Sequence, residues 1–364
     1  MDLYDFVATT LLQPGVSDIH LTVNNAPWVR QDGRLLAVQE PSWVDDSLIR
    51  VLLERLGVPD PNAALATIEK RERELAREDA RSGLDFGAEV QGVRLRCNLA
   101  LANGGLLSLV MRKLNDHIPS LASLGLPDTI AHQVDKPTGL VLVTGPTGSG
   151  KSTTLASILD YLNEQVEGHI LTIEDPVEYL LPQRRCKVTR KEIHKDAPSF
   201  LGALRAAMRQ DPDIIMIGEI RDRETMRAAM SAAETGHLVL GTLHTTSAAK
   251  TVDRVLSFFP ADDKEWARGA FATVLNCIVA QTLVPKKEGG RALAYEILIN
   301  TPDIRTTIAE ARFVQIPNQM EQGREQGQVL MHRVLADLVR KSAVSREAAM
   351  LSSYDPLRLA KELQ

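Results

Sequence analysis

The residues most able to do chemistry stand in Gly139–Leu155, which reads GLVLVTGPTGSGKSTTL. Within it, Gly145–Ser152 matches the pattern G-x-x-x-x-G-K-[S/T] at every fixed position. The apolar run Leu140–Val143 predicts a buried strand before this loop, and the apolar spacing in Ser152–Leu162 predicts a helix after it. In that context backbone N–H groups and a helix N-terminus converge, so the pattern predicts a phosphate-binding loop. The residues predicted to hold the phosphates are Gly145, Pro146, Thr147, Gly148, Ser149, Gly150, Lys151, Ser152 and Thr153.

Two side chains of this loop have distinct predicted tasks. The Lys151 ammonium would reach the outer phosphates, and the Ser152 hydroxyl would ligate a Mg²⁺ ion. The competing interpretation is a glycine-rich turn that only connects a strand to a helix. All the fixed positions and both flanking elements are present, which favours phosphate binding.

Carboxylates follow two further apolar strands of the predicted sheet. Ile170–Tyr179 reads ILTIEDPVEY, and Asp213–Asp222 reads DIIMIGEIRD. Ligands of open α/β sheets bind at the carboxyl edge of the strands, where these acids would gather. Phosphoryl transfer needs a metal site and a group that orients water, and such acids can supply both. The acids that follow the strands are Glu174, Asp175, Glu178 and Glu219. The predicted metal ligands are Glu174, Asp175 and Glu219, together with Ser152.

Two histidines bracket the apolar segment HLVLGTLH. His244 ends a predicted strand at the ligand edge, and His237 precedes the same strand. An isolated histidine is more often structural than catalytic. The pattern alone leaves both interpretations open for these two residues.

Two arginines alternate with apolar residues in the N-terminal part of the chain. The strand period of two puts Arg94 and Arg96 on the same face, opposite the apolar side chains. Two neighbouring guanidinium groups repel each other unless an anion lies near them. Plain solvent exposure explains the pattern equally well at this stage.

The elements that must position these residues follow two patterns, of which the first covers residues 1–114. Helices are predicted at residues 1–12, Val44–Leu56 and Ala63–Arg81, and strands at Ile19–Val23, around the hairpin turn Asp32-Gly33 and across 84–114. The charged pairs Glu69/Arg73 and Glu74/Arg77 fall at helix-surface spacings, which is typical of a solvated face. We therefore predict a small α+β domain at 1–114 and a linker at 115–138, with a helix at Asp128–Val134.

From residue 139 the pattern changes to alternating strands and helices, which predicts an α/β core with a mainly parallel sheet. Strands are predicted at Leu140–Val143, His169–Ile173, Asp213–Gly218, His237–Leu243 and Ala292–Ile299, and helices at Ser152–Leu162, Ser199–Arg209, Arg223–Glu234, Thr246–Phe258 and Asp262–Gln281. Residues 302–363 are predicted to be mostly helical. The core would span residues 139–300, and a helical C-terminal region would span 301–364.

Composition narrows the class of protein. The chain has 364 residues and a formal net charge of −5, which argues against nucleic-acid binding. No apolar run approaches the about 18 residues needed to span a membrane, and the acidic start MDLYDFVATTLLQPG does not resemble a signal peptide. We therefore expect a cytoplasmic protein that contacts a membrane only through partners. The separated cysteines Cys97, Cys186 and Cys277 indicate neither a zinc module nor a disulfide framework.

Five motifs together make the chain resemble a known family. They are SDIHL at Ser17–Leu21, GPTGSGKS at Gly145–Ser152, ILTIEDPVEY at Ile170–Tyr179, RQDPDIIMIGEIRD at Arg209–Asp222 and AAETGHLVLGTLHTTSAAKTVDR at Ala232–Arg254. The chain resembles the secretion ATPase superfamily over nearly its whole length, and most closely the PilT-like branch, the type IV pilus retraction ATPases. This resemblance implies an N-terminal PAS-like domain, a RecA-like P-loop ATPase domain, a hexameric ring, and ATP with Mg²⁺ as ligands.

The resemblance also implies catalytic roles for several side chains. Glu178 would polarise the attacking water, and Glu219 would hold Mg²⁺ through water. His237 and His244 would sense the γ-phosphate. Together with Lys151, these residues make up the expected catalytic set.

Three arginines of the N-terminal domain acquire a nucleotide role from the same resemblance. Arg94, Arg96 and Arg112 match positions whose arginines reach the nucleotide in that family. This favours a site element over solvent exposure for the two arginines on the shared strand face.

The chain departs from the family pattern in its C-terminal region. Retraction ATPases carry a helix reading A-I-R-N-L-I-R-E where this chain has Asp303–Glu310, and their later M-Q-T-[L/F]-D is replaced by Gln328–His332. The expected function is a motor that hydrolyses ATP to retract type IV pili, acting on a platform protein at the inner membrane. The alternatives are an accessory PilU-like pilus motor and an ATPase of a type IVB or type II secretion system. Glu178 and Glu219 disfavour a scaffold that binds ATP without turnover.

Overall fold

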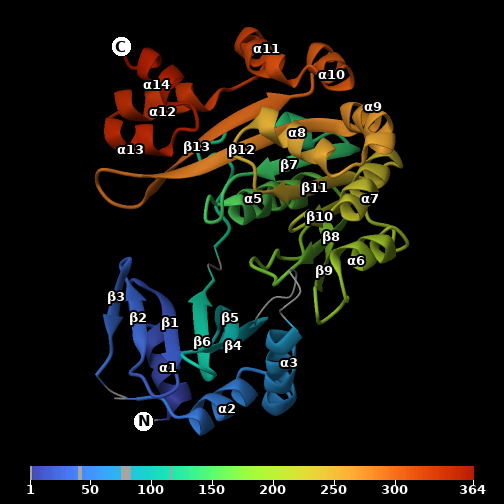
Figure 1. Ribbon diagram of the computed structural model, residues 1–364. Coiled ribbons are helices and arrows are strands. Elements are labelled where there is room, and N and C mark those ends of the chain that lie inside the picture. Colours follow the sequence, from blue (N-terminus) through green and yellow to red (C-terminus); the bar gives the residue numbers. More distant parts are fainter. Residues whose placement is uncertain (1, 40–42, 75–82, 115–116) are drawn as a thin grey trace. The chain divides into compact units, whose positions relative to one another are not determined.

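The computed structural model describes residues 2–39, 43–74, 83–114 and 117–364, with the backbone alone at residues 69–74. The chain forms two compact units (Figure 1). The first comprises Met1–His117 and the short segment Asp175–Tyr179, and the second comprises Ile118–Glu174 and Leu180–Gln364. Each unit has a hydrophobic core of its own.

Over the residues described, the first unit is a six-stranded antiparallel sheet packed against three helices. Its strands lie in the order β3-β2-β1-β6-β5-β4. Its elements are α1 (Leu3–Leu11), β1 (Val16–Thr22), β2 (Trp28–Gln31), β3 (Arg34–Ala37), α2 (Asp46–Arg55), α3 (Pro61–Glu74), β4 (Gly83–Val90), β5 (Val93–Ala102) and β6 (Leu106–Lys113). Apolar side chains of the helices and the central strands fill its core. The predicted combination of helices with period-two strands is confirmed.

Local sequence signals explain the turns and helix starts of this unit. Asp32 and Gly33 join β2 to β3 with φ of 47° and 80°, as the predicted hairpin turn requires. Asp2 and Asp45 cap α1 and α2, since each side chain accepts a hydrogen bond from a backbone N–H group of the first turn.

The charge-rich helix predicted at Ala63–Arg81 is confirmed as far as the structure describes it. Its counterpart α3 ends at Glu74, and Leu65 and Ile68 on its inner face are buried. The remainder of the predicted helix, and the charged pairs at 69/73 and 74/77, lie outside the described side chains.

The second unit is built on a seven-stranded mixed sheet in the order β13-β12-β7-β11-β10-β8-β9. All neighbouring strands are parallel except β12 and β13. The elements are α4 (Thr129–Val134), β7 (Gly139–Thr144), α5 (Lys151–Gln165), β8 (Gly168–Glu174), β9 (Cys186–Glu192), α6 (Phe200–Ala207), β10 (Ile214–Ile217), α7 (Arg223–Glu234), β11 (Leu238–Leu243), α8 (Ala248–Ser257), α9 (Lys264–Val274), β12 (Leu275–Pro285), β13 (Arg291–Ile299), α10 (Pro302–Ala309), α11 (Ile316–Gln322), α12 (Met331–Arg340), α13 (Arg346–Ser352) and α14 (Pro356–Glu362). The predicted α/β fold with a mainly parallel sheet is confirmed.

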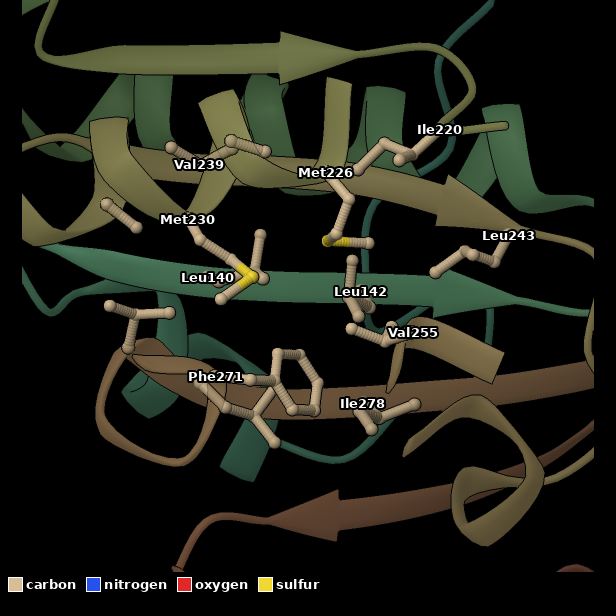
Figure 2. Close-up of a cluster of buried hydrophobic side chains, with 14 of the residues drawn as sticks. Leu140, Leu142, Ile220, Met226, Met230, Val239, Leu243, Val255, Phe271 and Ile278 are labelled. Atoms are coloured by element: carbon tan, nitrogen blue, oxygen red, sulfur yellow. The ribbon is translucent and has the colours of Figure 1, made fainter. Parts of the chain in front are cut away.

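Helices cover both faces of this sheet, because its central strands are apolar on both sides. Leu140 and Leu142 of β7 point into a core shared with α6, α7, α8 and α9. Val141 and Val143 point to the opposite face, into a core shared with α4 and α5. Figure 2 shows part of the core on the face of β7 that carries Leu140 and Leu142. Its labelled residues are Leu140, Leu142, Ile220, Met226, Met230, Val239, Leu243, Val255, Phe271 and Ile278. A strand enclosed in this way has a fixed position, and so does the loop that follows it.

The structure corrects one predicted helix and adds one strand. The predicted helix Asp262–Gln281 is wrong in its second half, because α9 ends at Val274 and β12 begins at Leu275. The first residues of β12 are buried on both faces between β7 and β13, so they show no alternation that would mark a strand. The added strand is β9, at the edge beside β8, whose basic residues obscure its period of two.

The C-terminal region is helical from α10 to α14, as predicted. Helices α12, α13 and α14 share a small core of their own with β12 and β13. Within the described ranges, no helix is long and apolar enough to cross a membrane.

A buried carboxylate joins these last helices to the sheet. Glu296 of β13 is 2% exposed, and its Oε1 accepts a hydrogen bond of 2.8 Å from the backbone N–H of Ala248 at the start of α8. Its Oε2 accepts a hydrogen bond from the hydroxyl of Tyr354, which lies between α13 and α14. Burial raises the pKa of Glu296, and the hydrogen bonds from Tyr354 and Ala248 offset only part of that effect. The folded protein therefore favours the protonated carboxyl more than the unfolded chain does.

Replacing Glu296 by Gln should change stability in a pH-dependent way. A carboxyl whose pKa is raised on folding from its ordinary 4.5 contributes stability below that value and loses it as the pH rises through the folded pKa. Glutamine does not titrate, so the melting temperature of Glu296→Gln relative to wild type should rise from about pH 5 to about pH 8. Thermal unfolding over that range measures the difference. The exposed Glu265→Gln serves as control, and a difference independent of pH would contradict the raised pKa.

Candidate functional site

The predicted phosphate-binding loop, called the phosphate loop below, joins β7 to α5 at the carboxyl edge of the sheet. Its three glycines adopt a φ that other residues rarely take, 150° at Gly145, 78° at Gly148 and 87° at Gly150, the N-cap of α5. A Cβ on Gly145 would lie 2.2 Å from the carbonyl oxygen of Gln281 and 2.5 Å from Ser149 Oγ, so glycine is required there. The first N–H groups of a helix have no acceptor within it, and the start of α5 can therefore bind a phosphate.

Lys151 is anchored to the loop that precedes it. Its ammonium donates hydrogen bonds to the carbonyl oxygens of Gly145 at 2.9 Å and Pro146 at 3.1 Å. Ser152 and Thr153 lie in the first turn of α5, with side chains that are partly exposed. The predicted phosphate-binding residues thus form one continuous loop and helix start.

Three further strand ends lie beside this loop, in the sheet order β7-β11-β10-β8. Because the four strands are parallel, they end at the same edge. His244 follows β11 directly, Glu219 follows β10 after one glycine, and Glu174 is the last residue of β8. The structure therefore brings these three predicted residues to the edge that carries the phosphate loop.

His244 and Glu219 contact each other at this edge. The His244 Nε2 atom lies 3.0 Å from Glu219 Oε1, and it carries the proton because a carboxylate only accepts. The second oxygen of Glu219 accepts a hydrogen bond from Arg221. Burial works to raise the pKa of Glu219, but the hydrogen bonds and charges of Arg221 and His244 outweigh it, so the pKa lies below its ordinary value. Glu219 is therefore ionised near neutral pH.

Glu174 ends β8 as a largely buried carboxylate. It is 9% exposed, and its Oε1 accepts a hydrogen bond of 2.8 Å from the hydroxyl of Thr172. Thr172 lies two residues earlier on the same strand, so both side chains share one face of β8. The strand itself therefore orients this acid.

His237 does not reach the phosphate loop of its own chain. It precedes β11, and the pairing of Leu238 with Gly139 puts it at the amino end of β7, whereas the loop follows the carboxyl end. Its Nδ1 lies 2.9 Å from the carbonyl oxygen of Ala232, near the C-terminal end of α7, and carries the proton of that hydrogen bond. The two histidines that bracket β11 thus lie at opposite edges of the sheet.

In the first unit, Arg94 and Arg96 share one face of β5, as predicted, and contact the segment Asp175–Tyr179. Arg94 donates to the carbonyl oxygens of Glu178 at 2.9 Å and Val177 at 2.7 Å. The Nη1 atom of Arg96 lies 3.3 Å from Glu178 Oε1. The carboxylate of Glu178 thus pairs with Arg96, while the guanidinium of Arg94 bonds to the backbone carbonyls of the same segment.

Arg112 lies on β6 directly opposite Arg96. Its Nε donates a hydrogen bond of 2.6 Å to Oδ1 of Asp18, which is 3% exposed. Burial works to raise the pKa of Asp18, but hydrogen bonds from Ser17 and Arg112 outweigh it and the pKa is lowered. Asp18 therefore stays charged and orients Arg112, although the SDIHL motif by itself does not reveal this pairing.

Comparison with known proteins identifies the family. The family model described as "Type II/IV secretion system protein" matches residues 3–354. The chain belongs to this family.

Two curated relatives and one solved structure illustrate the similarity. The Pseudomonas aeruginosa "Type IV pilus retractation ATPase PilT" is 42% identical over 350 residues, which cover 96% of this chain and 97% of that protein. A Neisseria gonorrhoeae "Twitching motility protein" is 44% identical over 268 residues, 73% of this chain and 71% of that protein. The solved structure of "the Pilus Retraction Motor PilT and Bound ADP" matches with a TM-score of 0.84 and 38% identity, over 99% of each chain.

This member of the type II/IV secretion system family supports its phosphate loop with a side chain that sequence reasoning misses. Gln281 of β12 is 1% exposed. Its Nε2 donates a hydrogen bond of 2.8 Å to the carbonyl oxygen of Ser149, and its Oε1 accepts one of 2.9 Å from Thr154 Oγ1. One amide thus joins the loop to the first turns of α5. No local signal marks it, because its partners lie far away in the sequence.

Replacing Gln281 by Leu should weaken nucleotide binding by this family member. The carbonyl of Ser149 and the hydroxyl of Thr154 would be left buried and unpaired, at a cost of about 1–3 kcal/mol each, and the loop would lose its support. A ligand stabilises the folded state according to its affinity, so ADP should raise the melting temperature of the variant less than that of wild type.

The matched control for this experiment is Gln328→Leu. Gln328 is 4% exposed, and its amide likewise makes two hydrogen bonds, to the backbone N–H and C=O of Ile299 at 2.9 Å and 2.8 Å. Its loss should lower the melting temperature but preserve the rise produced by ADP. Equal rises in the two variants would show that Gln281 does not serve the loop.

Proposed function

We propose that this protein is an ATPase motor that hydrolyses ATP to retract type IV pili and so drives twitching motility. The observation that carries the proposal is the whole-chain similarity to a pilus retraction ATPase, at 42% identity, in a chain whose phosphate loop lies beside Glu219 and His244. An accessory pilus motor or a secretion-system ATPase would use the same machinery. The chain is 42% identical to the retraction ATPase but 34% identical to a Pseudomonas aeruginosa "Type IV pilus ATPase PilU" over a similar length, which favours retraction.

In this proposal the phosphate loop binds the phosphates of ATP. Backbone N–H groups of the loop and of the start of α5 would face the phosphate oxygens. Lys151, which bonds to the loop carbonyls in this structure, would carry its charge to the outer phosphates. His244 would sense the γ-phosphate through its place beside Glu219.

The residues at the strand ends fit a Mg²⁺ ion, which prefers oxygen ligands. Ser152 offers a hydroxyl at the start of α5, and Glu219 offers an ionised carboxylate that Arg221 and His244 hold in place. Glu174 and Asp175 are proposed as further acids of this site. When bound, the ion would neutralise charge on the phosphates.

The groups proposed to act on water and on the transition state belong to the first unit. Glu178 would polarise the attacking water. Arg94, Arg96 and Arg112 would bring positive charge to the phosphates as the bond breaks. These side chains are already ordered by one another and by Asp18.

The proposed assembly is a hexameric ring in the cytoplasm, at the inner membrane. Each chain would contribute a PAS-like domain at 1–114, a linker at 115–138, a RecA-like core at 139–300 and the helical region at 301–364. The ring would act on an inner-membrane pilus platform protein, touch the membrane only through that partner and bind no nucleic acid. His237 would sense the γ-phosphate only of a nucleotide held by another chain, since it lies at the opposite edge from its own loop.

Two substitutions test the ATPase directly. Lys151→Ala removes the charge on the outer phosphates, and Glu219→Ala removes the ionised acid of the metal site. Each should lower steady-state phosphate release by a factor of about 10²–10³, the usual effect of losing one group that stabilises transition-state charge. The exposed residues Lys264 and Glu265 of α9 provide charge-matched controls as alanine variants. Wild-type turnover in either site variant would refute the assignment.

Helix α10, whose sequence departs from the family pattern, is proposed to pass the motion of each chain to the pilus platform protein. Ile304 and Ile308 are buried on its inner face, as their spacing predicts, while Arg305 and Glu310 are exposed. The double substitution Arg305→Ala with Glu310→Ala should leave folding and ATP turnover nearly unchanged, because neither residue lies at the phosphate edge. It should nevertheless fail to restore pilus-dependent motility in a deletion strain.

The control for this output test removes the same two charges elsewhere in the C-terminal region. Arg324→Ala with Glu325→Ala alters an exposed turn after α11 and should restore motility fully. Full rescue by the α10 variant as well would show that this helix does not pass motion to the pilus. A loss of ATP turnover would instead show that α10 is a structural part of the ATPase.

A further inference from the structure

A buried threonine hydroxyl forms a three-way junction behind the phosphate edge. Thr251 of α8 is 0% exposed. Its Oγ1 lies 2.8 Å from the carbonyl oxygen of Ser247, 2.6 Å from Thr245 Oγ1 and 3.3 Å from Thr144 Oγ1. Three polar neighbours from two stretches of backbone, the end of β7 and the loop between β11 and α8, thus meet at a single oxygen atom.

The direction of each hydrogen bond follows from the chemistry of the groups. A hydroxyl has one proton to donate and two lone pairs that accept. The carbonyl oxygen of Ser247 cannot donate, so the proton of Thr251 is directed to it. Thr245 and Thr144 must therefore donate to the two lone pairs. The hydrogen-bonding capacity of the Thr251 hydroxyl is filled, and among neutral side chains of similar size only serine, which carries the same hydroxyl, could make all three bonds.

The hydrogen bonds of Thr251 with Thr144 and Thr245 lead to two parts of the candidate site, the phosphate loop and the segment that carries His244. Thr144 is the last residue of β7, immediately before the phosphate loop. Thr245 follows His244, whose ring contacts Glu219. The strand ends are otherwise joined here by backbone pairing of Leu243 with Thr144, with a hydrogen bond of 3.3 Å from the N–H of Gly145 to the Leu243 carbonyl. The threonine junction therefore ties the loop to the His244 segment through side chains.

We propose that Thr251 is a positioning residue for ATP hydrolysis, which sets His244 and its partner Glu219 at the correct distance from the phosphate loop. This inference rests on the proposed ATPase function and deepens it. Thr251 touches neither phosphate nor metal in this proposal, and it acts only through Thr144 and Thr245. A displacement of a catalytic group by about 1 Å can cost roughly 10²-fold in rate, so a single buried hydroxyl is sufficient to matter.

The chemical step, rather than nucleotide binding, should depend on this junction. The phosphate loop keeps its own backbone geometry and its support from Gln281 when Thr251 is changed. Binding of ADP should therefore be preserved. The His244 segment, by contrast, loses its tie to the loop, and the groups that act at the γ-phosphate lose their placement.

The experiment compares two substitutions of one residue. Thr251→Val keeps the shape and removes all three hydrogen bonds, and it should lower kcat by about tenfold or more while KM and ADP affinity change by less than about threefold. Thr251→Ser keeps the hydroxyl and should retain at least about half of the wild-type kcat. The matched control is Thr273→Val on α9, which removes a hydroxyl that likewise bonds to the carbonyl four residues earlier, Gly269, at 2.8 Å. It should leave kcat unchanged.

A second variant protects the test against misfolding. Thr245→Val removes only the hydrogen bond between Thr245 and Thr251, and Thr245 is partly exposed. This variant should lower kcat without changing ADP affinity. If Thr251→Val does not fold, this variant decides the question. If it folds, the double variant should lose little more than Thr251→Val alone, since both act through one atom.

The outcomes separate this inference from the proposed function. A wild-type protein without ATP turnover would refute the ATPase itself. An active wild type with full kcat in Thr251→Val, or with equal losses in Thr251→Val and Thr251→Ser, would refute the positioning role alone. Additive losses in the double variant would also refute it.

Discussion

Parallel pairing of β7 with β11 and of β11 with β10 is the constraint on which the site depends. Thr144 lies opposite Leu243, and Ile217 lies opposite Gly241, so the phosphate loop, His244 and Glu219 leave the sheet side by side. The strands are buried on both faces, and a slip by one residue would turn every side chain of a strand to the wrong core. Core packing thus sets the geometry of a polar site that contains none of the core residues.

Residues that follow a buried strand could be predicted from the sequence, because their signals are local. The phosphate loop has fixed glycine and lysine positions, and Glu219 follows an apolar run directly. The shared face of Arg94 and Arg96 follows from strand period alone, and the structure confirms it by placing Glu178 against both. The same reasoning treats His237 and His244 alike, and only the direction of β11 separates them.

The side chains that support the site could not be predicted, because each acts on a partner far away in the sequence. Gln281 reaches Ser149 and Asp18 reaches Arg112, and nothing in the residues near Gln281 or Asp18 indicates those contacts. The strand that carries Gln281 resembles the continuation of a helix, because burial on both faces erases the alternation that periodicity needs. Buried polar groups must find partners, but the sequence does not say which.

Helix α8 connects this site to the C-terminal helices through buried polar groups at its start. The hydroxyl of Thr251 is hydrogen-bonded to that of Thr144 at the end of β7. The backbone N–H of Ala248 donates a hydrogen bond to Glu296, which also accepts one from Tyr354. A displacement of α8 away from Glu296 would leave a buried carboxyl without one of its donors, which is costly in a low-dielectric interior. Helix α8 and the junction of α13 with α14 are therefore held to β13 at one point. Any shift of the His244 segment that moves α8 must either move these helices with it or break that buried contact.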